Sequence, residues 1–302
     1  MSILPGGPRR PHDPLPRPAL PARSSRPWLL IGPVIGLCLL TGCGEKKIDA
    51  KLDSIAQELF SPRRTPEQYM IVAVSAEDAD IRRDAITRIA RADHHKKEWA
   101  IKGFMAIACL ESDAQTRCVA IRALARTGDP RAAETVLKIL NYRDHPAEEV
   151  YPPSELVRWD AAVALADLLA AGQVPEEQME LARTTCIQRL RYDTDRHARI
   201  AAARGLGSFP DAEVIATLIA ALRDDDFAVV HQCEESLVRL TGVTHSTDVA
   251  AWEAWQEGNA EQLFAQAGTV PEQRRPPYSN SVEKMAYETR DVVEWLWPGP
   301  AK

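Results

Sequence analysis

Hydrophobic residues follow helical spacing through the middle of the chain, and one short pattern occurs there five times. The copies are residues 81–86, 116–121, 157–162, 198–203 and 229–234, and they begin 35, 41, 41 and 31 residues apart. Each copy has an aliphatic residue four positions after its small fifth residue, which places an apolar stripe along a helix. The small residues are Ala85, Ala120, Ala161, Ala202 and Cys233.

Each copy is preceded by a residue that can cap a helix. These residues are Asp78, Asp113, Ser154, Asp195 and Asp226. Their side chains can accept hydrogen bonds from the free amides of a first helical turn. A further apolar stretch precedes most of the caps, at residues 99–110, 132–140, 179–190 and 214–222. The pattern therefore predicts a repeating unit made of a helix, a turn and a capped helix.

Stacking of these units predicts the fold. Neither helix of one unit can bury its apolar face alone, whereas stacked units share one continuous core. We therefore expect an all-α protein, an α-solenoid of about five helix pairs over residues 65–243 with flanking capping helices. The repeat lengths and the residue pattern resemble HEAT repeats, most closely the phycobilisome-lyase HEAT-like type. This resemblance implies an architecture more than a function.

Arginine occupies the second position of four copies, as Arg82, Arg117, Arg158 and Arg199, and Val230 takes that place in the fifth. One arginine per unit predicts a ladder along the stack. In HEAT-like stacks such arginines usually bond to acids or carbonyls of the adjacent unit. Binding of an anionic partner is the alternative interpretation.

The third unit contains an insertion, roughly Tyr142 to Pro153. Insertions in solenoids emerge on one face, which is often the binding face. A tolerated surface loop would give the same sequence, so both interpretations remain open.

Residues 244–302 are predicted to form a helical extension that caps the array or binds a partner. Trp252 and Trp255 share one side of a helix at residues 250–256, a linker follows at residues 268–279, and an amphipathic helix follows from Ser279 to Trp297. The candidate partner-binding residues are Trp252, Trp255, Trp295 and Trp297.

The N-terminal pattern differs from the rest of the chain. Residues 1–27 are rich in proline and arginine, an apolar run extends from Trp28 to Leu40, and Thr41-Gly42-Cys43 comes directly after it. A basic segment, a short apolar core and small residues are typical of an export signal. The run is shorter than the roughly 20 apolar residues that a spanning helix needs, which makes a permanent transmembrane helix a poor interpretation.

Residues 40–43 resemble the lipobox of bacterial lipoproteins. That resemblance implies removal of residues 1–42, lipid on the thiol of Cys43, and a lipid-anchored protein of the bacterial cell envelope that faces the periplasm or the exterior. Residues 43–64 would then be a tether and a leading helix. An ordinary cleaved signal peptide and an uncleaved anchor are the alternatives to this lipid anchor.

Removal of residues 1–42 would change the formal net charge from −6 to −10, because they hold five arginines and one acid. Such a chain lacks the basic footprint of a nucleic-acid-binding protein. We therefore expect no nucleic-acid partner.

The sequence lacks the motifs of familiar catalytic sites. It contains no H-E-x-x-H, no phosphate-binding glycine loop and no G-x-S-x-G. We expect Cys109, Cys118, Cys186 and Cys233 to be core residues, with Cys109 and Cys118 the one pair considered for a disulfide. We therefore expect no enzyme, no cofactor, no metal and no small-molecule substrate, and a membrane-tethered scaffold or assembly factor that binds proteins. The alternative is an enzyme or lyase-type subunit, which the HEAT-like resemblance implies.

Overall fold

Helices pair in sequence order throughout the described part of the chain, residues 64–275 and 281–285 of the computed structural model. These residues contain no β-strand. The first helices of the pairs are α2 (Pro66–Ser75), α4 (Glu98–Leu110), α6 (Arg131–Leu140), α8 (Glu176–Tyr192) and α10 (Ala212–Ala221). The second helices are α3 (Ala79–Arg91), α5 (Ala114–Ala125), α7 (Glu155–Ala170), α9 (Arg196–Leu206) and α11 (Phe227–Thr241). Short 3-10 helices η2 (Asp93–Lys96), η3 (Tyr142–Asp144) and η4 (Glu272–Arg274) lie between or after them.

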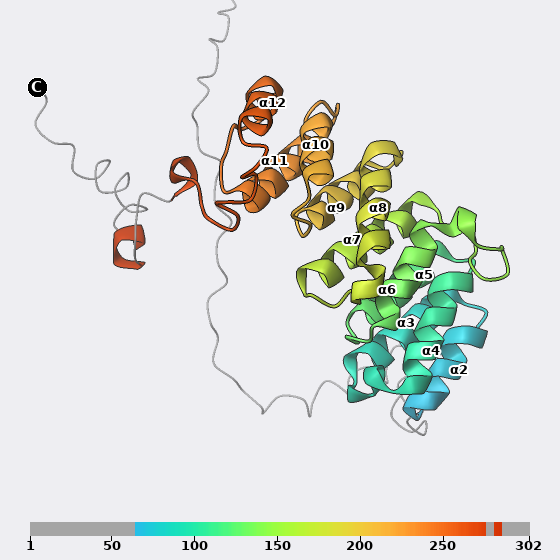
Figure 1. Cartoon of the computed structure of the whole chain (residues 1–302). Coiled ribbons are helices and arrows are strands. Elements are labelled where there is room, and N and C mark those ends of the chain that lie inside the picture. Colours follow the sequence, from blue (N-terminus) through green and yellow to red (C-terminus); the bar gives the residue numbers. More distant parts are fainter. Residues whose placement is uncertain (1–63, 276–280, 286–302) are drawn as a thin grey trace, which may run out of the picture. The chain divides into compact units, whose positions relative to one another are not determined.

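The pairs stack into two parallel rows. Each first helix packs on the next first helix, and each second helix packs on the next second helix. Figure 1 shows the pairs following one another in chain order from α2 to α11. Helix α12 (Val249–Gly258) packs on α10 and so extends the row of first helices by one member. This arrangement is the predicted all-α solenoid.

The five predicted N-caps are confirmed. Asp78, Asp113, Ser154, Asp195 and Asp226 each have an extended backbone and accept a hydrogen bond from a first-turn amide of the second helix that follows. The side chain of an N-cap accepts a hydrogen bond from a first-turn amide that would otherwise have to donate to water. The caps therefore determine where each second helix begins.

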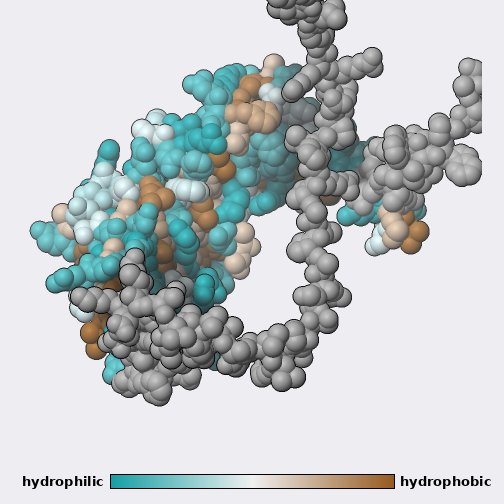
Figure 2. All heavy atoms as spheres, turned by 180° about the vertical axis from the view of Figure 1, so that it is seen from behind, coloured by the Kyte–Doolittle hydropathy of each residue, from teal (hydrophilic) through white to brown (hydrophobic). Residues whose placement is uncertain are grey.

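The core runs without interruption along the stack. All five small residues of the repeat are buried, and larger apolar side chains such as Phe104, Ile121 and Leu165 fill the space between the rows. Small side chains at the helix contacts allow close packing, and the interior gains its stability from apolar burial. On the face seen in Figure 2, hydrophobic residues occur in small groups within a mainly hydrophilic surface.

The predicted linker is wrong over residues 268–275, because these residues fold back against α11. The amide of Gly268 donates to the carbonyl of Arg239 at 3.0 Å, and Pro271 is buried. Gly242, with φ of 73°, ends α11, and a Cβ there would lie 2.0 Å from the carbonyl oxygen of Gln266. The proline and glycine residues correctly indicated that this segment lacks regular secondary structure. The prediction failed because a segment without regular structure can still form hydrogen bonds and close contacts with a helix.

A pair of carboxylates holds the same segment in place. Arg274 of η4 forms ion pairs with Glu234, which is buried, and with Glu235 on α11. Glu234 also accepts a hydrogen bond from the hydroxyl of Thr244 at 2.7 Å. Residues 266–274 therefore contact α11 and the glycine that ends it. Of the predicted helix from Ser279 to Trp297, residues 281–285 are helical and the others lie outside the described residues.

Candidate functional site

The repeated arginines join each helix pair to the next one. Arg158, in the first turn of α7, donates to both carboxylate oxygens of Asp193, with Nη2 3.0 Å from Oδ1 and Nε 3.1 Å from Oδ2. The same contact joins Arg82 to Glu111 and Arg199 to Asp224. These ion pairs connect a second helix to the loop before the following second helix, so the geometry gives the three arginines a structural role.

The acidic partners are residues that sequence reasoning missed. Each lies two positions before an N-cap and accepts the backbone N–H of that cap: Asp113 N–H to Glu111 at 2.9 Å, Asp195 N–H to Asp193 at 3.0 Å and Asp226 N–H to Asp224 at 2.9 Å. The sequence contains a signal that could have identified them, namely an acidic residue at the same distance before each of these three caps. One carboxylate therefore orders its own turn and also receives the guanidinium of the preceding unit.

Arg117 departs from this pattern because Pro152 occupies the place of the acid. Its guanidinium donates to the carbonyls of Ala108 at 2.9 Å and Pro152 at 3.3 Å, and lies 5.8 Å from the ring centre of Tyr151. Burial lowers the pKa of Arg117. Nη2 of this buried side chain has no hydrogen-bond partner among the described residues. The insertion has therefore replaced a carboxylate contact with carbonyl and ring contacts.

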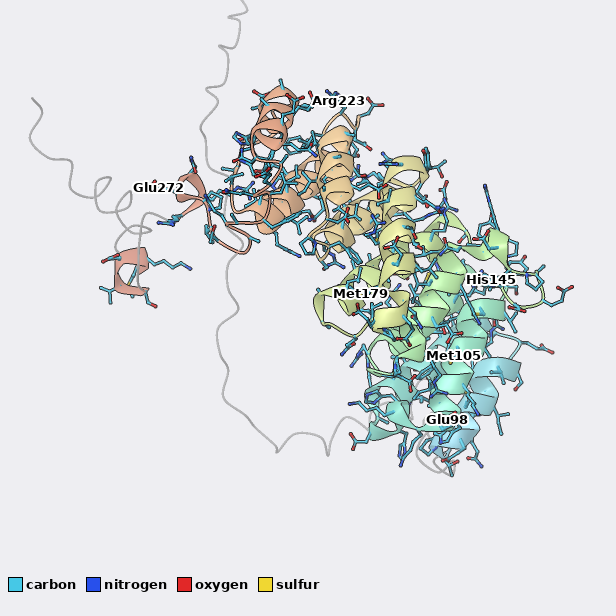
Figure 3. The ribbon with its side chains drawn as sticks, in the orientation of Figure 1. Glu98, Met105, His145, Met179, Arg223 and Glu272 are labelled. Carbon is cyan, nitrogen blue, oxygen red and sulfur yellow. The ribbon has the colours of Figure 1, made fainter. Side chains whose placement is uncertain are left out.

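The insertion itself is ordered against the array. It begins with η3, Val150 is buried, and the amide of Tyr151 donates to the carbonyl of Cys109 on α4 at 2.8 Å. Figure 1 shows its light-green loop standing out from the side of the array, and Figure 3 labels His145 on it.

A pocket of about 380 Å³ lies between the start of the insertion and the end of α8. The side chains around it are mostly polar. They belong to Leu140, Asn141, Tyr142, Arg143, Asp144, Arg158, Gln188, Arg189, Tyr192, Asp193 and Thr194. We call this cavity the insertion pocket. It brings the ladder residue Arg158 together with the insertion, two features that lie apart in the sequence.

A second surface lies on the row of second helices. The rings of Trp159 on α7 and His197 on α9 stack with their centres 4.6 Å apart and their planes 29° from parallel. A hollow of about 180 Å³ beside them is also lined by Val163, Ile200, Ala201, Arg204 and Gln232. On α11 the exposed ring of Phe227 lies 6.2 Å from that of His231. We call Trp159, His197 and Ile200, which line the hollow, the aromatic surface.

The predicted partner-binding tryptophans are distributed differently. Trp252 is fully buried, and its indole N–H donates to the carbonyl of Ser246 at 2.9 Å. It is therefore a core residue, and its assignment to partner binding was wrong because the apolar side of α12 faces α10. Trp255 is half-buried and contacts Trp252 edge to face. Trp295, Trp297 and the lipid-attachment candidate Cys43 lie outside the described residues.

The cysteines of the described region are unpaired core residues. Cys118, Cys186 and Cys233 are buried, Cys109 is half-buried, and all four are free thiols. Burial raises the pKa of Cys186 and of Cys233 to about 12, so these thiols remain protonated at neutral pH. Among the described residues, no group of three or more His, Cys, Asp or Glu side chains is arranged to hold a metal ion. No helix in that region has both the length and the apolar character to cross a bilayer.

Comparison with known families agrees with this architecture. Residues 184–253 match HEAT repeats, and residues 116–142 match the PBS lyase HEAT-like repeat. The first match extends from within α8 to α12, and the second from α5 to the start of η3. The comparison with curated proteins gives no significant match. The chain therefore contains HEAT-like repeats, which are stacked here as an α-solenoid.

Proposed function

We propose that this protein is a membrane-tethered scaffold or assembly factor of the bacterial cell envelope, and that it binds partner proteins through the aromatic surface. The observation that carries the proposal is the partly exposed Trp159–His197 stack on the row of second helices, whose other faces pack into the core of the array. Stacked HEAT-like repeats offer extended surfaces of this kind to other proteins. Tryptophan is also the side chain most enriched at the energetic centres of protein interfaces.

The charges beside the aromatic surface support a protein partner. Arg204, which borders the hollow, donates to Asp167 at 2.7 Å and to the carbonyl of Val163 at 3.2 Å. Its charge is thus largely matched within the array, which leaves ring faces, aliphatic side chains and the amide of Gln232 as the contacts offered to a partner. Such a surface fits an apolar or aromatic side chain of a partner surrounded by a polar rim.

The membrane tether is the second part of the proposal. Its support is the apolar run and lipobox-like residues that end at Cys43. Lipidation with two or more chains would attach the protein stably, whereas one chain gives only reversible binding. The solenoid would then present its surfaces close to the membrane.

An enzymatic or lyase-type role remains the alternative, and the match of residues 116–142 to the PBS lyase HEAT-like repeat is compatible with it. The two roles differ in what the purified protein contains. A bound chromophore in its visible absorption spectrum, or a stoichiometric metal, would favour the alternative over the scaffold.

Trp159→Ala should abolish most partner capture by the full-length protein in its own membranes. Loss of a central tryptophan costs about 2 kcal/mol of binding free energy, which corresponds to roughly thirtyfold weaker binding. The measurement is crosslinking in membranes followed by quantitative mass spectrometry of the captured proteins. Leu110→Ala is the matched control, because Leu110 is also exposed but lies at the end of α4. Equal capture by the wild type and Trp159→Ala would contradict the proposed surface.

Cys43→Ser should prevent incorporation of labelled palmitate and release the protein from the membrane fraction, or stall its export. The reason is that the thiol is the only group on this side chain that could receive the diacylglycerol. Cys109→Ser serves as the control, because it removes a thiol far from the lipobox in the sequence. If Cys43→Ser carries as much label as the wild type, Cys43 is not the attachment site.

A further inference from the structure

The insertion pocket carries an excess positive charge in an otherwise acidic protein. Its charged lining residues are Arg143, Arg158, Arg189, Asp144 and Asp193, so the formal charge of the lining is positive by one. From these residues we infer that the insertion pocket is a binding site for a single carboxylate group, carried by a partner polypeptide or by a small molecule.

Asp193 does not neutralise the whole pocket, because its single negative charge is shared between the guanidinium groups of Arg158 and Arg189. Its buried carboxylate receives Arg158 and, at 3.3 Å, Nη1 of Arg189. The Nε of Arg189 is buried without a hydrogen-bond partner among the described residues. An unmet buried donor is costly, and Arg189 lines the pocket, so a bound oxyanion is a candidate partner for this side chain.

Arg143 supplies the freest positive charge of the pocket. It is exposed at the start of the insertion, and among the described residues no carboxylate is found to interact with its charge. Its guanidinium carbon lies 5.9 Å from the ring centre of Tyr142, and its Nε lies 3.4 Å from the hydroxyl of the same residue. The ring holds the side chain by a cation–π contact while the two Nη groups remain available. A planar guanidinium matches the two oxygens of a carboxylate.

The rest of the lining favours a carboxylate on an organic group over a free phosphate. Tyr142 and Tyr192 offer ring surfaces, and Tyr192 is exposed on 75% of its area. Gln188 is exposed and adds an amide donor. One net positive charge is balanced by one carboxylate, whereas a phosphate monoester brings up to two negative charges at neutral pH. The insertion pocket shares no lining residue with the hollow beside Trp159, and the inference does not depend on the proposed function.

Isothermal titration calorimetry on the full-length protein in detergent tests the assignment. The probes are N-acetylphenylalanine, its neutral amide, and an acetylated tetrapeptide that has uncharged side chains and ends in phenylalanine with a free carboxylate. We expect the two acids to bind at least tenfold more tightly than the amide. Arg143→Gln should weaken their binding about tenfold, which is the size of one charge-assisted contact. Arg126→Gln, an exposed arginine outside the pocket, should leave the binding unchanged.

Some outcomes of this experiment identify the kind of molecule that carries the carboxylate, and others show whether the site exists at all. Tighter binding of the tetrapeptide than of N-acetylphenylalanine supports a polypeptide partner, and equal binding of both acids supports a small carboxylate. Equal binding of the acid and its amide, no binding of any probe, or equal loss in Arg143→Gln and Arg126→Gln would overturn the inference. Partner capture through Trp159 is measured separately, so failure here leaves that proposal standing.

Discussion

Replacing Trp252 with alanine should lower the free energy of unfolding by about 3–5 kcal/mol, the range found for buried aromatic side chains cut back to alanine. The whole side chain is buried, and its N–H bond to Ser246 would leave an unpaired carbonyl after the change. Its ring also contacts His245, 4.9 Å away and edge to face, and Trp255 at 5.7 Å. The alanine would therefore leave a large cavity between α12 and its neighbours.

The shift in the midpoint of urea denaturation, followed by circular dichroism, measures this loss. Trp255→Ala is the control, because Trp255 lies three residues further along the same helix but is only half-buried. We expect the control to lose less than half as much stability. A Trp252→Ala protein that is as stable as the wild type, and that loses partner binding instead, would restore the original assignment of Trp252 to an interface.

The repeat could be predicted from the sequence because its signals are local. A cap such as Asp113 and a small buried residue such as Ala120 act within one or two helical turns, so their spacing alone determines the helix boundaries and the buried face. Periodicity then predicts the stack, since units of this kind cannot bury their apolar faces alone.

Contacts between distant residues were harder to predict. Asp193 and Arg158 are 35 positions apart, and only the stacking geometry brings them together. The segment that contains Arg274 has the prolines of a linker, although the buried Glu234 on α11 required a cation. The available signal in both cases was a charged residue in an unusual position. Asp193 lies beside a helix cap, and Glu234 lies within the apolar pattern of a helix.

The insertion pocket illustrates a third limit of sequence reasoning. Arg143 and Tyr192 belong to different units, and nothing in their spacing indicates that they line one cavity. Replacement of the ladder acid by Pro152 was visible in the sequence, but its consequence, a buried Arg117 that contacts carbonyls, depends on the path of the inserted loop. Insertions escape prediction because they interrupt the repeat on which the prediction rests.

Asp193→Ala should be the most destabilising change among the ion pairs that join the units, with a loss of about 3–5 kcal/mol at pH 7, typical of breaking a buried ion pair from one side. The carboxylate is almost completely buried and receives Arg158, Arg189 and the amide of Asp195. Without it two poorly solvated guanidinium groups would face each other. Asp224→Ala is the graded control and should cost less, because Asp224 is more exposed and pairs with Arg199 alone.

The stability lost on Asp193→Ala should also become smaller as the pH falls. Burial by itself would raise the pKa of Asp193, but the hydrogen bonds from Arg158 and the Asp195 amide and the nearby arginine charges lower it overall. A carboxylate with a lowered pKa in the folded state stabilises the protein fully above its unfolded pKa of about 3.9, and this contribution disappears as the pH falls through the folded pKa. Urea denaturation at pH 7, 5 and 3 should therefore show the same difference between wild type and Asp193→Ala at the two higher values, and a smaller one at pH 3. A difference that grows on acidification would mean that Asp193 is not held as a carboxylate in the folded protein.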